Sequence, residues 1–308
     1  FNLGSLIKEE LGRFGGLEDG VHGFMNFYFA RRLKQTGVKI DTVVDWYENH
    51  GIDRGWNYGF HTFYSEINTF GYNMVFLSKW HLATSPLPTE RKKKVLPKLI
   101  LSPSSYLVKL IQKNDLLLKV KTTGAFRFPN PKKCIPKTGP INILVPLSYK
   151  SDAALNSVLS TRSLIQDLNK TSKIESKLTF KAHPAIAHHS LEKLKKNHFD
   201  ENEVWTDRPL SEELPTADIV LGEWTFALLE SLNTGVPVGI LRSTDGLFHS
   251  SIPPGCAEKM TINIDSQDSL MKLVNIALKR RSKGTLLKNP LLEPPTRSLA
   301  QELFGLQS

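Results

Sequence analysis

The sequence predicts an α/β protein with two domains, each built on a largely parallel sheet. Short apolar runs typical of strands alternate with helical segments along most of the chain. The 308 residues are enough for two domains that each bury a core. A stretch rich in Pro and Lys at 129–139 separates two such series and is the expected linker. The expected halves are therefore 1–128 and 140–285, followed by a tail at 286–308.

The first half is expected to begin with helices, at 5–13 and 21–35, where apolar residues recur at helical spacing. The residues that follow them alternate between strand and helix patterns. The expected strands are 42–47, 73–77, 98–101 and 116–121, with a helix from 104 to 113.

The second half shows the more regular series, which is typical of a doubly wound sheet with right-handed crossovers. The expected strands are 141–147, 178–181, 219–221, 236–241 and 260–264, and the expected helices are 151–169, 190–197, 225–233 and 266–281. A short amphipathic helix at 296–305 is expected to pack back onto the first domain.

Composition narrows the class of protein. No apolar run approaches the roughly 20 residues of a membrane-spanning helix, and no signal peptide opens the chain. Since the chain begins at Phe1 without Met, we expect a trimmed piece of a longer protein. Cys134 and Cys256 are too few for a disulfide framework or a zinc site, so we expect a cytoplasmic protein.

The net charge of +10 lies in clusters, which are either solvated faces or sites for an anionic partner. That partner could be a membrane surface, a nucleotide-sugar or nucleic acid, but no nucleic-acid motif supports the last. The clusters are 31–34, 91–94, 132–133, 193–196 and 279–283.

Two stretches of the second half place polar residues where a predicted strand ends. Lys181, His183 and Pro184 follow one strand, where an imidazole donor beside a proline turn could bind a phosphate or a base. The alternative for this motif is a structural turn. Gly222 ends the next strand, and Thr225 begins a helix whose positive end would attract phosphate; the alternative for Thr225 is a plain cap.

Glu230 lies on that same helix, in the run Leu229-Glu230-Ser231-Leu232, before Gly-Val-Pro-Val restarts the sheet. Together with Lys-x-His-Pro, this order resembles bacterial glycosyltransferases of the GT-B fold that build surface carbohydrates, such as capsule and lipopolysaccharide. It is most similar to sialyltransferase-like and Kdo-transferase-like enzymes. The resemblance implies two Rossmann-like domains facing a cleft, a C-terminal helix crossing back, and a CMP-activated sugar bound by His183, Pro184 and Thr225.

The first half resembles surface carbohydrate biosynthesis proteins through Trp46-Tyr-Glu-Asn-His-Gly-Ile-Asp-Arg-Gly-Trp56. We interpret 48–60 as a strand-to-helix loop that carries the chemistry. Glycosyl transfer needs a carboxylate as base or nucleophile, and Glu48 is the first candidate, with His50 and Asp53 assisting it. We assign sugar or acceptor binding to Arg54, Trp56 and Asn57. The alternative is a local Asp53–Arg54 ion pair, core tryptophans and a capping Glu48.

The resulting prediction is a glycosyltransferase that moves a CMP-activated nonulosonic acid or Kdo to a glycan or lipid-linked acceptor. His188, His189 and His249 lack ligand spacing and no Asp-x-Asp motif occurs, so we expect no metal and no cofactor. Two enzyme alternatives remain, a CDP-glycerol-type phosphotransferase and a UDP-sugar epimerase. A third is a non-catalytic nucleotide- or glycan-binding partner of an assembly complex. Peripheral association with the inner face of the membrane is a further expectation.

Overall fold

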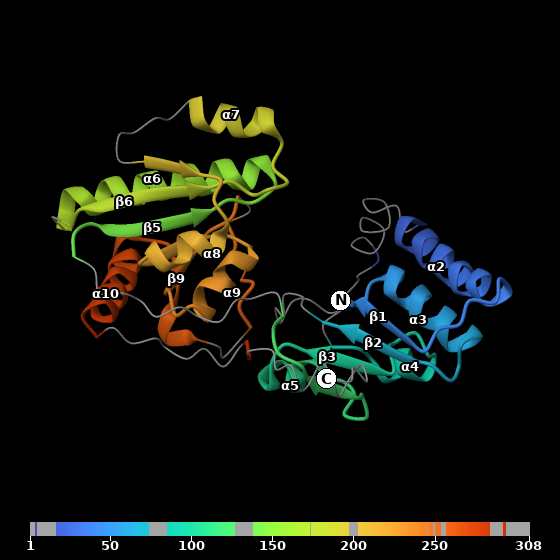
Figure 1. Cartoon of the computed structure of the whole chain (residues 1–308). Helices are drawn as coiled ribbons and strands as arrows, with labels where there is room; N and C mark the ends of the chain where they lie inside the picture. Colours follow the sequence, from blue (N-terminus) through green and yellow to red (C-terminus); the bar gives the residue numbers. More distant parts are fainter. Residues whose placement is uncertain are drawn as a thin grey trace. The chain divides into compact units, whose positions relative to one another are not determined.

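The computed structural model describes residues 4, 17–73, 85–126, 138–172, 174–196, 203–244, 246–248, 250–253, 257–283 and 292–293 (Figure 1). The chain forms two compact units, one made of 1–127 with 290–308 and the other of 128–289. We call them domain 1 and domain 2. Most of the expected linker lies outside the described residues. No described helix combines the length and apolarity needed to cross a membrane.

Domain 1 contains a four-stranded parallel sheet in the order β1-β2-β3-β4. Its strands are β1 (Thr42–Trp46), β2 (Asn68–Tyr72), β3 (Leu99–Ser102) and β4 (Val120–Thr122). Its helices are α2 (Leu17–Gln35), α3 (Gly51–Phe63), α4 (Pro88–Lys92) and α5 (Ser105–Ile111).

Domain 1 differs from the sequence prediction at several elements. The segment expected to be a strand at 116–121 forms a turn at Leu116 and Leu117 and a strand only from Val120, and α4 was not predicted. The helix expected at 5–13 lies outside the described residues.

A strand that was not predicted, β2, occupies Asn68–Tyr72, and a Cβ on Gly71 there would come within 2.8 Å of the Tyr47 side chain. The strand expected at 73–77 lies outside the described residues except for Asn73. The region expected to be a loop, 48–60, is helical from Gly51 onward. Its glycines mark a helix crossing, because a Cβ on Gly55 would lie 1.8 Å from the Gly23 carbonyl oxygen of α2. The true loop is therefore only 47–50.

Domain 2 contains a six-stranded parallel sheet in the order β10-β9-β8-β5-β6-β7. Its strands are β5 (Ile141–Pro146), β6 (Ser176–Lys181), β7 (Glu203–Thr206), β8 (Ile219–Gly222), β9 (Val238–Leu241) and β10 (Thr261–Ile264). Its helices are α6 (Ser151–Ser172), α7 (His188–Lys196), α8 (Leu210–Glu213), α9 (Phe226–Asn233) and α10 (Gln267–Lys283), with short 3-10 turns at Leu214–Thr216 and Glu258–Met260.

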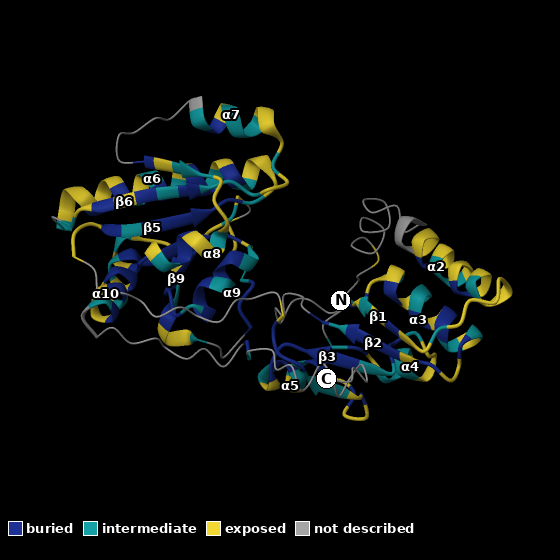
Figure 2. Ribbon diagram, viewed as in Figure 1, coloured by how far each residue is buried: buried dark blue, intermediate teal, exposed yellow. Residues whose placement is uncertain are grey.

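The core of domain 2 explains why the sequence pattern was clear there. The central strands β5 and β8 are apolar and almost wholly buried, so they read as continuous hydrophobic runs. Figure 2 shows β5 largely in the colour of buried residues. Helices α6 and α10 add their apolar faces to one cluster with β5, β6 and β8. The α10 residue Arg281 forms a buried ion pair with Asp218, which stands just before β8.

The chain returns to domain 1 near its end. The Glu293 amide donates to the Pro103 carbonyl (3.0 Å), and the Glu293 carbonyl accepts from the Ala125 amide (2.8 Å). Its carboxylate accepts from the Ser105 amide (2.8 Å), and Leu292 beside it is buried. The helix expected at 296–305 lies outside the described residues.

Candidate functional site

The order of strands in domain 2 defines where a ligand would bind. After β5 the chain adds β6 and β7 on one side of it, and then β8, β9 and β10 on the other. In such sheets the ligand crevice lies outside the carboxyl ends of the strands, at the point where this order reverses. That point is between β5 and β8, so the residues that follow these strands form the first candidate site.

His183 lies beside this point in a fixed orientation. The Ile186 amide donates to the His183 carbonyl (3.0 Å), which closes a turn with Pro184 at its second position. The Ala185 amide donates to His183 Nδ1 (3.1 Å), and this bond leaves the ring proton on Nε2. The His183 ring lies 5.8 Å from the ring of Tyr149, which follows β5. The turn thus presents an N–H donor next to an exposed aromatic ring.

The other residues predicted to bind nucleotide lie at the same edge of the sheet. Lys181 ends β6, in register with Pro146 at the end of β5. Gly222 ends β8, where a Cβ would lie 3.7 Å from the Pro146 carbonyl oxygen and 3.3 Å from Thr225 Cγ2. Thr225 is the N-cap of α9, since its hydroxyl accepts from the Ala227 amide (3.3 Å). A capping residue and an anion site at a helix N-terminus are compatible.

Glu223 is a residue of this edge that the sequence interpretation missed. Its carboxylate is buried and accepts hydrogen bonds from Asn156 Nδ2 (2.5 Å) and Ser157 Oγ (3.4 Å) of α6. Asn156 also donates to the Arg242 carbonyl after β9 (2.9 Å). These bonds fix the start of α6 to the ends of β8 and β9, and they give the Glu223 carboxylate a structural role beside α9.

Glu230 lies one turn into α9 and is half-buried. A carboxylate in this position can accept two hydrogen bonds from a pair of neighbouring hydroxyl groups, such as those of a ribose.

The carboxyl end of β1 in domain 1 forms the second candidate site. Glu48 and His50 lie close together there, with 3.9 Å between Glu48 Oε2 and His50 Nδ1. Trp46 Nε1 donates to the other carboxylate oxygen, Glu48 Oε1 (2.6 Å). The Glu48 and His50 side chains keep 35% and 45% of their surface exposed, so both can meet a ligand. Between them, the buried Asn49 has a positive φ of 61° that turns the chain sharply.

The side chain of Asp53 holds the backbone of this loop in place. The backbone amides of Glu48 and His50 both donate to Asp53 Oδ2, each at 2.9 Å. Burial raises the pKa of the Asp53 carboxyl above its ordinary range. The structure therefore places Asp53 as the buried support of the Glu48–His50 loop.

Asp45 is a second feature that the sequence interpretation missed. It lies on β1 and accepts a hydrogen bond from Asn57 Nδ2 (3.3 Å). Burial and then the charge of Asp53 raise the pKa of Asp45 to about 7. A carboxyl inside an otherwise apolar strand was the available signal. At neutral pH, this group can exchange a proton directly beneath the loop.

The predicted sugar-binding residues lie in different surroundings. Arg54 is half-exposed and pairs with Glu90 (2.6 Å). Trp56 packs inside domain 1, stacked on Phe29 (5.9 Å between ring centroids) and edge-on to Phe60 (4.9 Å). Asn57 is fully buried and donates to the Asp53 carbonyl (2.8 Å). Of these three residues, only Arg54 is substantially exposed.

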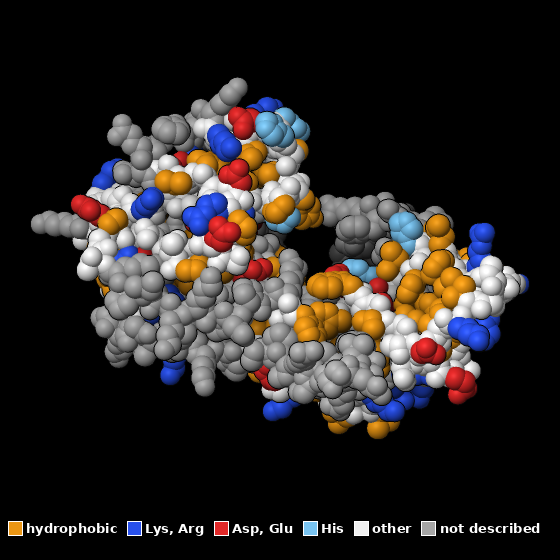
Figure 3. All heavy atoms as spheres, viewed as in Figure 1, with side chains coloured by type: hydrophobic (Ala, Val, Ile, Leu, Met, Phe, Trp, Pro, Cys, Tyr) orange, Lys and Arg blue, Asp and Glu red, His pale blue; other side chains and the backbone are white. Residues whose placement is uncertain are grey.

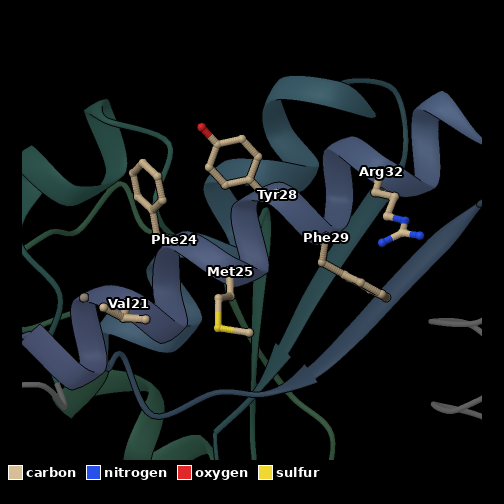
Figure 4. Close-up of a pocket in the computed structure, with 7 residues that line it drawn as sticks. Val21, Phe24, Met25, Tyr28, Phe29 and Arg32 are labelled. Carbon is tan, nitrogen blue, oxygen red and sulfur yellow. The ribbon is translucent and has the colours of Figure 1, made fainter.

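A hollow of about 710 Å³ runs along the outer face of α2 (Figure 4). Its wall is apolar apart from the Tyr28 hydroxyl and the Arg32 guanidinium, and this composition does not suit a nucleotide. The residues that form it are Gly20, Val21, Phe24, Met25, Tyr28, Phe29 and Arg32. Among the described residues, no group of three His, Cys, Asp or Glu side chains has the geometry to hold a metal ion.

Comparison with known proteins identifies the fold. No family model matches the chain, and no curated protein matches it. Solved structures do match over most of its length. UDP-GlcNAc 2-epimerase from Methanocaldococcus jannaschii has a TM-score of 0.58 at 14% identity, over 92% of this chain and 82% of its own.

Two further structures match similarly. The S. aureus MnaA–UDP co-structure has a TM-score of 0.55 at 12% identity, covering 91% of this chain and 77% of its own. UDP-GlcNAc 2-epimerase from Neisseria meningitidis bound to UDP-GlcNAc has a TM-score of 0.52 at 13% identity, covering 91% and 81%. At these identities the likeness shows the fold alone, and none of these neighbours is of the sialyltransferase or Kdo-transferase type. The likeness confirms the expected fold class: the chain has the GT-B fold, with two Rossmann-like domains.

Proposed function

We propose that this protein is a nucleotide-sugar enzyme that binds a UDP-activated sugar through domain 2 and carries out proton transfer with domain 1. The observation that carries the proposal is the His183 turn at the edge of domain 2. There, an oriented Nε2–H and the Tyr149 ring lie beside the reversal point of the sheet. The N-terminus of α9 would attract phosphate, and Glu230 would accept from the ribose hydroxyls.

The nucleotide is more consistent with UDP than with CMP. Structures with the same fold include proteins described as bound to UDP and to UDP-GlcNAc. The preference for CMP came from the sialyltransferase-like and Kdo-transferase-like resemblance, which these neighbours do not support. The epimerase alternative is therefore favoured over transfer from a CMP-activated sugar, and we take UDP-sugar 2-epimerisation as the reaction.

In a 2-epimerisation, a base takes the C2 proton as the C1–O bond to UDP breaks, and the products of this step are an unsaturated sugar and UDP. UDP then adds back at C1 while an acid returns a proton to C2 on the opposite face. Glu48 is the proposed acid–base residue, because its carboxylate is exposed, partnered by His50 and oriented by Trp46. Asp53 positions the loop through the two backbone amides that it binds. Asp45, with a pKa of about 7, is the nearby carboxyl best suited to exchange protons at neutral pH.

The reaction can be tested by incubating the protein with UDP-GlcNAc in D₂O and following the sugar by NMR. An epimerase incorporates solvent deuterium at C2, whereas a glycosyltransferase releases UDP only when an acceptor is present. We expect Glu48→Gln to slow incorporation by roughly 10²–10⁴-fold. The matched control is Glu66→Gln, which changes an exposed acid before β2 and should leave the rate unchanged.

The outcomes separate the alternatives. Deuterium incorporation that persists at full rate in Glu48→Gln would contradict the residue assignment. Acceptor-dependent release of CMP from a CMP-sugar, without exchange at C2 of UDP-GlcNAc, would restore the transferase prediction. Binding of nucleotide without turnover of either substrate would favour the non-catalytic partner.

A further inference from the structure

One end of domain 1 carries a large excess of positive charge. Residues 85–126 contain nine Lys or Arg against two acids. Both acids are already in ion pairs, Glu90 with Arg54 (2.6 Å) and Asp115 with Arg91 (2.6 Å). The lysines in this stretch that the structure places as exposed are Lys92, Lys93, Lys94, Lys109, Lys113 and Lys119. This surface is therefore strongly cationic.

Two leucines stand out in the middle of these lysines. Leu116 and Leu117 are 83% and 73% exposed, more than any other large hydrophobic side chain that the structure describes. They occupy the turn between α5 and β4. Isolated exposed apolar residues are common on protein surfaces, but two adjacent leucines at the tip of a turn form a small continuous apolar surface.

The turn that displays the leucines is braced from inside. The Leu117 amide donates to Asp115 Oδ1 (3.1 Å), and the Leu118 amide donates to the Asp115 carbonyl (3.2 Å). Arg91 holds the Asp115 carboxylate and keeps the pKa of that carboxyl below its ordinary range. Leu118 is buried in the core of domain 1. The exposure of Leu116 and Leu117 is thus a property of an anchored turn.

Lys92 at the end of α4 lies beside this turn, and Lys93 and Lys94 follow it in the chain. The charge of Lys92 contributes to lowering the pKa of Asp115, and Asn114 Nδ2 donates to the Ser85 carbonyl ahead of α4 (2.8 Å). In Figure 3, basic and hydrophobic side chains lie next to one another along the lower margin of domain 1. The turn precedes β4, so it lies at the edge of the sheet where strands begin, opposite the Glu48–His50 loop that follows β1.

We propose that this end of domain 1 docks on an anionic lipid bilayer, with Leu116 and Leu117 inserted at the interface and the surrounding lysines facing the headgroups. Stable peripheral binding takes two signals, and an apolar anchor with a basic patch supplies both. A nucleic acid would use the lysines but would leave two leucines in water, so the leucines favour lipid. The candidate site at the opposite edge of the sheet would remain open to substrate.

The proposal can be tested by co-sedimentation of the full chain with vesicles of phosphatidylcholine alone or with about one third phosphatidylglycerol. We expect binding only to the anionic vesicles. Leu116→Ser/Leu117→Ser should weaken it roughly 10- to 100-fold, because apolar insertion is lost. Lys92→Gln/Lys93→Gln/Lys94→Gln should weaken it about 100-fold and reduce its dependence on salt, at about fivefold per lysine.

The matched control is Phe24→Ser/Met25→Ser, which removes similar exposed apolar area from α2 of the same domain. It should leave vesicle binding unchanged, and all variants should bind UDP and unfold as the wild type does. Loss of binding in this control, with full binding in the Leu116/Leu117 variant, would overturn the proposal. So would equal binding to neutral vesicles, or binding to duplex DNA that displaces the vesicles and survives loss of the leucines.

Discussion

Replacing Asp45 by Asn should remove a pH dependence from the stability of domain 1. Burial and the charge of Asp53 raise the pKa of Asp45 from its ordinary 3.8 to about 7. The folded state therefore holds this proton more tightly than the unfolded chain does. The stability linked to the proton is fully present below about pH 4 and is lost as the pH rises through about 7.

The size of the effect follows from these two values. Each pH unit of difference corresponds to about 1.4 kcal/mol, so a difference of about three units sets an upper limit near 4 kcal/mol for the whole loss. Between about pH 5 and pH 8, the wild type should lose about 2 to 3 kcal/mol of this stability. Asn cannot ionise, and its side-chain oxygen can still accept the hydrogen bond from Asn57.

The assay is urea unfolding of the full chain at about pH 5 and pH 8, followed by tryptophan fluorescence. A Trp205→Phe/Trp224→Phe background leaves Trp46, Trp56 and Trp80, all within 1–127, so the signal reports domain 1. The free energy of unfolding of Asp45→Asn should rise relative to the wild type as the pH increases. A difference between the two proteins that is the same at both pH values would refute the reasoning.

Three further substitutions test the packing of α3 on α2, the cap of α9 and the buried ion pair between Asp218 and Arg281. Gly55→Ala should lower the free energy of unfolding in urea by about 3 kcal/mol, because its Cβ would lie 1.8 Å from the backbone of α2. In the control, Gly20→Ala, the added Cβ has no other atom within 4 Å, so this change should be neutral or slightly stabilising. Thr225→Ala should lower the melting temperature through loss of about 1 kcal/mol of cap energy, and Thr225→Ser should restore it; equal melting temperatures would argue against the cap. Asp218→Ala should cost about 3 to 5 kcal/mol in urea unfolding by leaving Arg281 buried without its partner, and a loss under 1 kcal/mol would show that water replaces the carboxylate.

The sequence predicted the architecture of domain 2 well because its central strands are buried on both faces. The runs at 141–147 and 219–221 can hardly be anything but interior strands, and the structure confirms them as β5 and β8. It did not predict β7, whose Glu-Val-Trp-Thr pattern is that of a strand at the edge of the sheet. In domain 1, the sequence did not predict α3, because its glycines suggest a loop. These glycines allow α3 to pack closely against α2, and nothing in the neighbouring sequence indicates that contact.

Some features of the candidate site could also be predicted from the sequence, because they depend on hydrogen bonds between residues that are close in the chain. The His183–Pro184 turn and the Thr225 cap each involve residues within a few positions of one another. The contact of Tyr149 with His183 and the hydrogen bond from Asn156 to Glu223 join residues that are far apart in sequence. Such pairs depend on the order of strands in the sheet, which a single sequence does not specify.

Isothermal titration with UDP and CMP tests the claim that domain 2 binds a uridine nucleotide through the His183 turn. UDP should bind more tightly than CMP. His183→Ala should weaken UDP binding roughly tenfold, through loss of one oriented donor to the ligand. His189→Ala, which changes an exposed histidine of α7, should leave the affinity for UDP unchanged. Tighter binding of CMP, or an affinity for UDP that is unaltered in His183→Ala, would contradict the claim.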